Sequence, residues 1–203
     1  CSYIREIKIA IQGIQGSFHH QVAHRYFGEA IGLDECATFR DVANSLKNNK
    51  SDKAIMAIEN SIAGAILPNY ALIDSYDLHI IGEHFLDIHM NLMVLPGQTI
   101  VDIKEVHSHP IALLQCANFF SQYPHIKLVE SSDTAITAKR IQENQLRGIG
   151  ALAGPVAANI YDLEIIADGI HTVKSNKTRF VVLKASNKEI PKELINKASI
   201  KFE

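Results

Sequence analysis

Short apolar runs bounded by turn residues alternate along this chain with amphipathic stretches of helical period. Apolar runs rich in β-branched residues predict buried strands, and apolar residues three and four positions apart predict helices. The predicted strands cover residues 7–11, 53–58, 105–107, 127–130, 148–152 and 180–183. The predicted helices lie between them, at residues 18–27, 40–46, 67–75, 111–123, 134–142 and 155–161. Because strands and helices alternate, we expect an α/β fold with a mainly parallel sheet.

One long stretch, residues 79–95, does not fit a single strand or helix. It contains two extended apolar blocks, at residues 78–82 and 90–95, and is too extended in character for one helix. We interpret it as a segment that crosses between two halves of the molecule. A second crossing is expected near Asn176, where a polar loop leads back to the strand after Thr178.

Composition and charge exclude several classes of protein. The chain has 203 residues, of which 47% are hydrophobic and 21% are charged, as is usual for a soluble globular protein with a substantial core. A formal net charge of -2 disfavours nucleic-acid binding, which needs a clustered basic face. No apolar stretch approaches the roughly 20 residues of a membrane-spanning helix, and no charged-then-apolar leader precedes Ile7. We therefore expect a soluble protein with neither a nucleic-acid nor a membrane partner.

The cysteines and histidines do not form a recognisable metal or disulfide pattern. Cys1, Cys36 and Cys116 are far apart and make no C-x-x-C pair, so a reducing, cytoplasmic setting fits best. Cys116 lies in an apolar helical pattern and is predicted to be a buried, inert thiol. His107 and His109 alternate on one strand, but no third ligand stands at a suitable spacing, so no metal site is predicted.

Polar residues cluster where predicted strands end or begin. The run 177–180, Lys-Thr-Arg-Phe, sets a hydroxyl, a guanidinium and an aromatic ring at the start of a strand. Asn60 and Ser61 follow the strand 53–58 and are either ligand contacts or caps of the next helix. Ser17 closes a glycine loop and either caps a helix in a plain tight turn or helps bind an anion.

Taken in order, five motifs carry a family resemblance. They are Gly13-Ile14-Gln15-Gly16-Ser17-Phe18, Ile58-Glu59-Asn60-Ser61 with Gly64, Ser108-His109-Pro110 with Gln115-Cys116, Asp133-Thr134-Ala135 and Thr178-Arg179-Phe180. In this order and at about this spacing, the set resembles the catalytic domain of prephenate dehydratase, the enzyme of phenylalanine biosynthesis. The resemblance covers the chain from about Ile7 to about Lys184.

The chain departs from the family pattern at four positions. Ile14 replaces the proline of the first loop, and His19 stands where a serine is usual. Ile111 occupies the glutamine position of Ser-His-Pro-Gln, and Asp133 replaces the serine of Ser-Thr-Ala. These departures affect the expected substrate contacts more than the expected reaction.

The resemblance implies a two-lobed fold of the periplasmic-binding-protein type II kind, with the active site in the cleft between the lobes. We place the first lobe at residues 1–82 plus 178–190 and the second at residues 83–177. The family often continues into a phenylalanine-sensing regulatory domain of the ACT type. Residues 191–203 combine a linker with what resembles the first strand of that domain, so we expect a trimmed or truncated chain.

The resemblance also implies the chemistry: prephenate loses its ring carboxylate as carbon dioxide and its ring hydroxyl as water, and phenylpyruvate remains. Aromatisation drives the reaction, so we expect no cofactor and no metal. Thr178 is expected nearest the leaving hydroxyl, with Glu59 and His109 as reserve acid candidates. The expected substrate contacts are Ser17, Asn60, Ser61, Ser108, His109, Gln115, Arg179 and Phe180. A homodimer or homotetramer is expected.

Two alternatives stay open at this point. Arogenate dehydratase performs the same elimination on the transaminated substrate, and the sequence does not separate the two activities. A solute-binding protein with the same two-lobed fold is the alternative from another class, and Cys1 would then be the lipidated first residue of a lipoprotein. The family motifs weigh against that second alternative. The ten histidines include His19, His20 and His24, which we expect on an exposed helical face.

Overall fold

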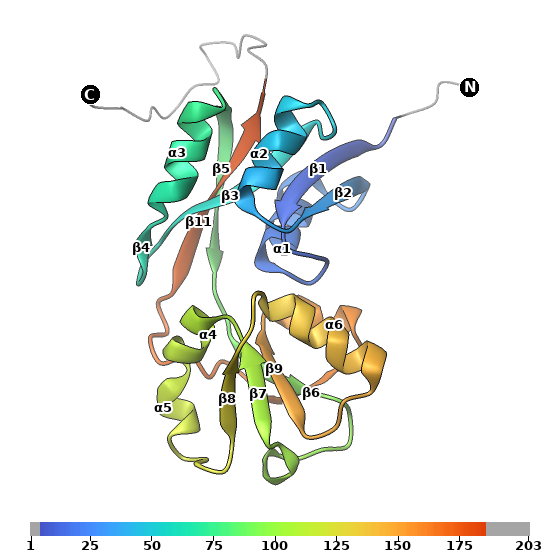
Figure 1. Cartoon of the computed structure of the whole chain (residues 1–203), viewed down its shortest axis with the longest axis vertical. Helices are drawn as coiled ribbons and strands as arrows, with labels where there is room; N and C mark the ends of the chain where they lie inside the picture. Colours follow the sequence, from blue (N-terminus) through green and yellow to red (C-terminus); the bar gives the residue numbers. More distant parts are fainter. Residues whose placement is uncertain (1–4, 186–203) are drawn as a thin grey trace.

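The computed structural model describes residues 5–185, which form two lobes, each built around one β-sheet (Figure 1). The first sheet has the strand order β2-β1-β3-β11-β5, with the short β4 paired to β3. Its strands are β1 (Ile7–Gln12), β2 (Ile31–Cys36), β3 (Lys53–Asn60), β4 (Gly64–Ala65), β5 (His79–Asp87) and β11 (Lys177–Lys184). Strands from the beginning and from the end of the described chain therefore belong to one sheet.

The second sheet has the strand order β10-β6-β9-β7-β8. Its strands are β6 (Asn91–Val94), β7 (Glu105–Ser108), β8 (Lys127–Glu130), β9 (Ile149–Ala153) and β10 (Glu164–Ala167). Apart from β4, each sheet has one strand antiparallel to its neighbours, β11 in the first and β6 in the second. These are the two strands that the chain enters directly from the other lobe, so the crossings fix their direction.

Helices cover the sheets, and most of them begin at the side of the sheet that faces the other lobe (Figure 1). The first lobe has α1 (Phe18–Phe27), α2 (Phe39–Lys47) and α3 (Leu67–Ser75). The second lobe has the 3-10 turn η1 (Ile100–Asp102) and the helices α4 (Pro110–Gln115), α5 (Ala117–Phe120), α6 (Thr134–Asn144) and α7 (Pro155–Ile160). In each lobe the carboxyl ends of the parallel strands and the first turns of the following helices point toward the other lobe (Figure 1). This is where open α/β sheets bind ligands.

Several elements differ from the predicted pattern. Strands β2 and β10 were not predicted, because each lies at the edge of its sheet and carries charged residues among its apolar ones. The helix predicted at residues 111–123 is two short helices that meet at Cys116. Strand β5 continues in the first sheet to Asp87, so the chain crosses after residue 87 and not at residue 82. The predicted regulatory start at residues 191–203 lies outside the described residues.

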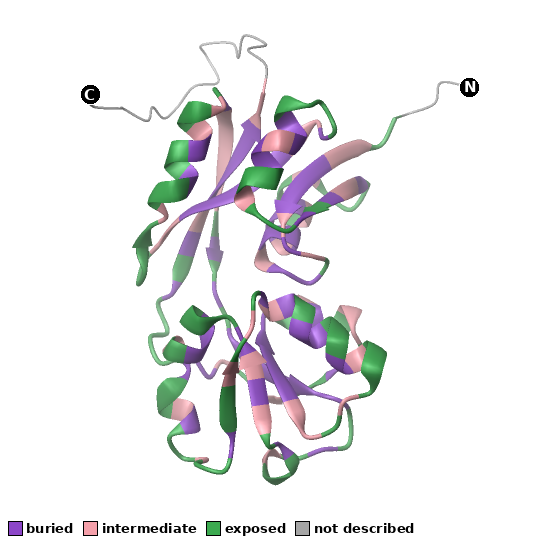
Figure 2. Ribbon diagram, viewed as in Figure 1, coloured by how far each residue is buried: buried purple, intermediate pink, exposed green. Residues whose placement is uncertain are grey.

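The apolar core is continuous between the lobes. One cluster of buried side chains includes Ile11 and Phe180 from the first sheet and Leu92 and Leu152 from the second. Ile88 and Met90, on the first crossing, belong to the same cluster. Figure 2 shows buried residues along the central strands of both sheets. Burial at about 25 cal/mol per Å² makes this shared core the main stabilising contribution, and it holds the two lobes together.

The lobes also touch through glycines on the α1 side of the cleft. A Cβ atom on Gly16 would lie 3.1 Å from the Tyr161 ring, and one on Gly154 would lie 2.8 Å from the Phe18 ring. The Tyr161 hydroxyl donates a hydrogen bond to the backbone carbonyl of Gln15 at 2.5 Å. Residues without Cβ atoms thus let the first-lobe glycine loop pack closely against the start of α7.

Within residues 5–185, no helix combines the length and apolarity needed to cross a membrane.

Candidate active site

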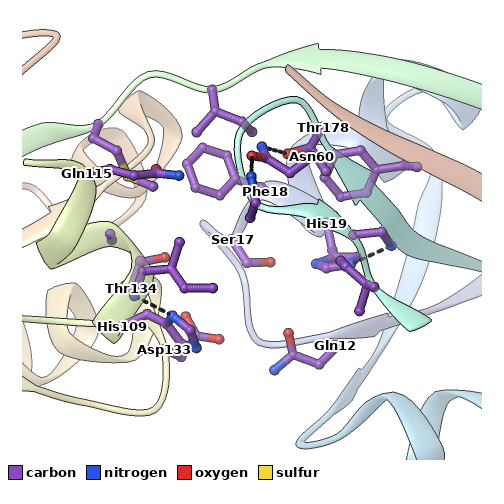
Figure 3. Close-up of a pocket in the computed structure, with 18 of the residues that line it drawn as sticks. Gln12, Ser17, Phe18, His19, Asn60, His109, Gln115, Asp133, Thr134 and Thr178 are labelled. Carbon is purple, nitrogen blue, oxygen red and sulfur yellow. Dashed lines mark hydrogen bonds between the residues drawn. The ribbon is translucent and has the colours of Figure 1, made fainter. Parts of the chain in front are cut away.

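A cavity of about 290 Å³ lies between the lobes, next to the two crossings. Both lobes and both crossings contribute to its wall. The lining residues are Gln12, Ser17, Phe18, His19, Phe39, Ala57, Asn60, Ala63, Ile66, Ile88, Met90, His109, Ile111, Ala112, Gln115, Ser132, Asp133, Thr134, Asn176, Thr178 and Phe180. In Figure 3, Asn60, Thr178 and His19 face the cavity from one side, and Gln115, His109 and Asp133 face it from the other.

A β-bulge in β3 decides which residues of that strand reach the cavity. Thr178 and Arg179 of β11 pair with Asn60 and Glu59, but Phe180 pairs with Ala57, so Ile58 is the extra residue. Residues three apart, such as Ala57 and Asn60, point to opposite faces of a regular strand. The extra residue rotates the strand between them, so both line the cavity.

The side-chain amide of Asn60 organises the polar end of the cavity. Its Oδ1 accepts hydrogen bonds from the backbone N–H groups of Ile62 at 2.9 Å and Ala63 at 3.0 Å. Its Nδ2 donates to the Lys177 carbonyl at 3.2 Å and to Thr178 Oγ1 at 2.9 Å. Because these backbone groups are purely donors or purely acceptors, they fix which way the amide points. Thr178 Oγ1 therefore accepts from Asn60, and its own proton remains available to donate into the cavity.

Asn176 extends this network to the second lobe. Its Oδ1 accepts from Asn60 Nδ2 at 2.7 Å, and its Nδ2 donates to Gln115 Oε1 at 3.2 Å. Its backbone carbonyl accepts from the N–H of Ile88 on the first crossing at 2.7 Å. The side chain is 1% exposed. Asn176 thus connects β3, both crossings and the end of α4, at the pivot between the lobes.

An apolar wall faces the polar groups. Phe180 is almost fully buried, and its ring makes an edge-to-face contact with His19 at a centroid distance of 5.0 Å. His19 Nε2 accepts a hydrogen bond from the backbone N–H of Ala57 at 3.1 Å, so His19 carries its proton on Nδ1. Burial lowers the pKa of His19 to about 4. His19 is thus a neutral part of the wall, and the expectation that His19 and His20 lie on an exposed face is wrong.

The second-lobe wall begins two helices at the cavity. Asp133 caps α6, with Oδ1 accepting from the backbone N–H of Ala135 at 2.7 Å. His109 caps α4, with Nδ1 accepting from the N–H of Ile111 at 3.2 Å, which leaves Nε2 for a ligand. Asp133 is 9% exposed, and burial raises the pKa of its carboxyl. Among the described residues of the lining, none is lysine or arginine.

Of the predicted site residues, the structure brings six together in the lining: Thr178, Asn60, Ser17, His109, Gln115 and Phe180. Ser61 lies outside it, where its hydroxyl donates to the Ser175 carbonyl and accepts from the N–H of Lys177. Ser108 is fully buried within the second lobe and donates to the Leu152 carbonyl at 3.0 Å. Both serines hold backbone segments in place and do not face the cavity.

Arg179 and Glu59 also lie outside the lining, on the opposite face of the sheet. Arg179 Nε donates to Glu83 at 2.7 Å, and its Nη1 donates to Glu59 at 3.3 Å. Side chains alternate along β11, so when Thr178 and Phe180 face the cavity, Arg179 faces away. The bulge turns Glu59 to the same far face. Arg179 therefore braces β3, β5 and β11, and Glu59 is not placed to act as an acid on a ligand in the cavity.

Several lining residues were not among the predicted contacts. Asn176 stands directly before the Lys-Thr-Arg-Phe run, and Asp133 departs from the family's serine, so both carried a signal in the sequence. His19 also stands where the family has a serine, whereas Gln12 carried no signal because it looks like an ordinary polar position. The predicted inert thiol Cys116 is confirmed as buried, and burial raises its pKa to about 12. His107 contacts Glu105 and Arg140 and does not line the cavity.

Comparison with known proteins agrees with the motif pattern. The family model described as prephenate dehydratase matches residues 9–188. The chain belongs to the prephenate dehydratase family. The match spans both lobes and both crossings, so it includes every element that lines the cavity.

Relatives in this family carry two activities in their names. A bifunctional chorismate mutase/prephenate dehydratase of Buchnera aphidicola is 32% identical and covers 94% of this chain and 50% of its own length. Arogenate dehydratase/prephenate dehydratase 1 of Arabidopsis thaliana, a chloroplastic protein, is 35% identical and covers 88% of this chain and 45% of its own length. The chain thus spans about half the length of these relatives.

A solved structure confirms the fold. The prephenate dehydratase of Arthrobacter aurescens in complex with L-Phe superposes with a TM-score of 0.80 at 25% identity, over 88% of this chain and 60% of that one. The α/β class and the two-lobed arrangement are confirmed by this match and by the two mixed sheets.

The buried neutral His19 predicts a pH dependence of stability. The folded pKa of about 4 lies below the ordinary value of 6.5, so the unfolded chain binds more protons between these pH values. The stability contribution is complete above pH 6.5 and is lost as pH falls toward 4. His19→Gln keeps an acceptor for the Ala57 N–H without titrating, and should reduce this loss by up to about 3 kcal/mol.

Urea unfolding from pH 7.5 to pH 4.5 measures the effect. His125→Gln, at an exposed position, is the control and should keep the wild-type pH dependence. His20, whose pKa is also lowered to about 4 by burial, leaves a residual dependence in both variants. A His19→Gln protein with the full wild-type pH dependence would show that the buried imidazole does not control acid stability.

Proposed function

We propose that this chain catalyses the decarboxylative dehydration of prephenate to phenylpyruvate, the reaction that gives its family its name. The observation that carries the proposal is the Asn60–Thr178 hydrogen bond at the wall of a largely apolar cavity between the lobes. The elimination moves the bonding electrons of the ring carboxylate through the ring to the opposite C–O bond. Carbon dioxide leaves, and the hydroxyl takes up one proton and leaves as water.

Thr178 is proposed to assist the departing hydroxyl. Because its Oγ1 accepts a hydrogen bond from Asn60 Nδ2, its O–H is polarised and directed toward the cavity. A donor fixed in a site that excludes water stabilises the negative charge that builds on a leaving oxygen. A threonine hydroxyl is itself a weak acid, so the consumed proton comes from another group. Of the two acid candidates, Glu59 pairs with Arg179 on the far face. His109 faces Thr178 from the opposite wall, so its proton would have to reach the hydroxyl through water in the cavity (Figure 3).

The substrate's carboxylates are proposed to bind at helix starts. Since no lysine or arginine belongs to the described lining, the first turns of α1 and α6 supply the positive potential. The rings of Phe18 and Phe180, with Ile66 and Met90, provide an apolar surface for the substrate ring. This arrangement needs no redox cofactor, because aromatisation drives the reaction.

Incubation of the chain with prephenate in the presence of a chelator tests the proposal. We expect phenylpyruvate to form faster than in the non-enzymatic reaction, followed by its ultraviolet absorbance in alkali. The same assay with arogenate, which undergoes the same elimination to phenylalanine, measures the alternative substrate. Rates equal to the non-enzymatic background with both substrates would contradict the assignment.

Replacement of Thr178 tests its proposed role. Thr178→Val keeps the branched shape but removes the hydroxyl, and should lower kcat by about 100- to 1,000-fold with little change in KM. Thr178→Ser keeps the hydroxyl and should retain most of the activity. Thr172→Val, at an exposed position outside the cavity, is the matched control and should behave like the wild type.

Thermal unfolding of each Thr178 variant accompanies the kinetics. A valine variant that melts near the wild-type temperature and turns over at the wild-type rate would show that Thr178 only supports the strand.

We further propose that the chain is cytoplasmic and forms a homodimer or homotetramer. Strand β5 supports the assembly, because it lies at the edge of the first sheet and Phe85 on it is 52% exposed. Leu67, at the start of α3 on the same lobe, is 70% exposed. Light scattering after size-exclusion chromatography measures the assembly, and a monomer at micromolar concentration would contradict it.

A further inference from the structure

Asp133 is the one carboxylate among the described lining residues, and it lies in the second-lobe wall against Gly13 of the first lobe. A Cβ atom on Gly13 would lie 2.7 Å from Asp133 Oδ2 and 3.5 Å from Ser17 Oγ. The carboxylate therefore reaches from the cap of α6 across to the first turn of α1. Gly13 has φ +93° and no side chain, and both properties are needed for this approach.

Helix capping alone does not require a carboxylate at this position. Serine, asparagine and aspartate are about equally good N-cap residues, and one oxygen is enough to accept from the Ala135 N–H. Asp133 replaces the serine that the family pattern has here. What the carboxylate adds to capping is a negative charge in a cavity whose described lining has no lysine or arginine.

Ionisation of Asp133 in this buried place costs free energy. Burial raises the pKa of the Asp133 carboxyl, because the ionised form is poorly solvated there. A ligand that brings a carboxylate to the helix starts beside Asp133 without a neighbouring cation would increase the cost, since like charges repel in a site of low dielectric. A ligand with an ammonium group would remove it by forming a charge-assisted hydrogen bond.

The position of Asp133 matches one part of the substrate. In prephenate and arogenate the ring hydroxyl and the side chain are attached to opposite carbons of the ring. With the hydroxyl at Thr178, the side chain extends toward the opposite wall. Asp133 lies on that wall, across the cavity from Thr178 (Figure 3). The side chain of prephenate carries a keto group at the position where that of arogenate carries an ammonium.

We infer that Asp133 makes this site selective for arogenate over prephenate by pairing with the ammonium group of the substrate side chain. This inference rests on the proposed elimination and on Thr178 as the contact of the leaving hydroxyl. Both substrates undergo the reaction, and Asp133 sets their relative rates. Asp133 acts on recognition of the side chain and takes no part in breaking the C–O bond.

The test compares kcat/KM for arogenate and for prephenate in the wild type, Asp133→Asn and Asp133→Ser. Wild type should favour arogenate, and both variants should lose about 10- to 100-fold in kcat/KM for arogenate, as expected for a hydrogen bond between charged groups. Their kcat/KM for prephenate should stay unchanged or rise. Both replacements are good N-caps, so α6 should form, and circular dichroism and thermal unfolding check this.

Asp102→Asn is the matched control. Asp102 is the third residue of a short helical turn in the second lobe, where its carboxylate accepts from the N–H of the N-cap Thr99 at 2.8 Å, and it lies outside the cavity. The Asp102→Asn replacement removes the same charge and should leave the ratio of kcat/KM for arogenate to kcat/KM for prephenate unchanged. Equal losses in the Asp102 and Asp133 variants would show a general charge effect and overturn the inference.

Two further outcomes overturn it. One is a substrate ratio within about threefold of wild type in both Asp133 variants, which corresponds to less than one weak hydrogen bond. The other is an equal loss with both substrates, which would place Asp133 in the common chemical step.

Binding of the two reaction products separates failure of this inference from failure of the proposed function. Phenylalanine and phenylpyruvate differ by the same ammonium and keto groups and need no turnover, so isothermal titration compares them directly. A preference for phenylalanine that Asp133→Asn abolishes supports the role of Asp133 even if neither substrate reacts. Equal affinities of the wild type for both products overturn it.

Discussion

The polar end of the cavity depends on the fixed orientation of one side-chain amide. The backbone N–H groups of Ile62 and Ala63 require an acceptor, and the Lys177 carbonyl requires a donor, so Asn60 has one way to satisfy them. That orientation makes Thr178 an acceptor toward Asn60 and leaves its own proton available to donate. It also anchors Asn176, through which the amide reaches Gln115 in the other lobe. Elements more than a hundred residues apart in sequence thus share one hydrogen-bonded centre.

The sequence is sufficient to place residues at strand ends, because carboxyl ends of parallel strands gather at one edge of a sheet. Asn60 and His109 reach the cavity for this reason. Thr178 reaches it because β11 is antiparallel and begins at the same edge of the first sheet. The sequence is not sufficient to place Glu59 or Arg179. Which face Glu59 occupies depends on the bulge at Ile58, and that bulge exists only in the pairing of β3 with β11. A register between strands so distant in sequence is a tertiary property that no local pattern contains.

The sequence pattern also fails to identify polar residues that are buried at the cavity. His19 and His20 occupy a stretch that looks like an exposed helical face, yet both are buried. His19 packs against Phe39 and Phe180, and His20 accepts a hydrogen bond from the Gly16 N–H, so tertiary contacts within the first lobe bury them. Asp133, like His19, is marked as a departure by the family motif. Its meaning depends on Gly13, 120 positions away, which leaves room for its carboxylate. Lobe packing, and not helix periodicity, determines which of these polar groups a ligand meets.

The position of β11 between β3 and β5 also determines the order in which the lobes can be completed during synthesis. β5 pairs with β11 in the first sheet, so until residues 177–184 leave the ribosome this sheet lacks an inner strand and β5 lacks the partner that holds it there. The second lobe is continuous in sequence from Asn91 to Ala167 and forms its whole sheet without β11. The lobe that begins the chain is therefore the last to close, reversing the usual amino-terminal-first order of folding.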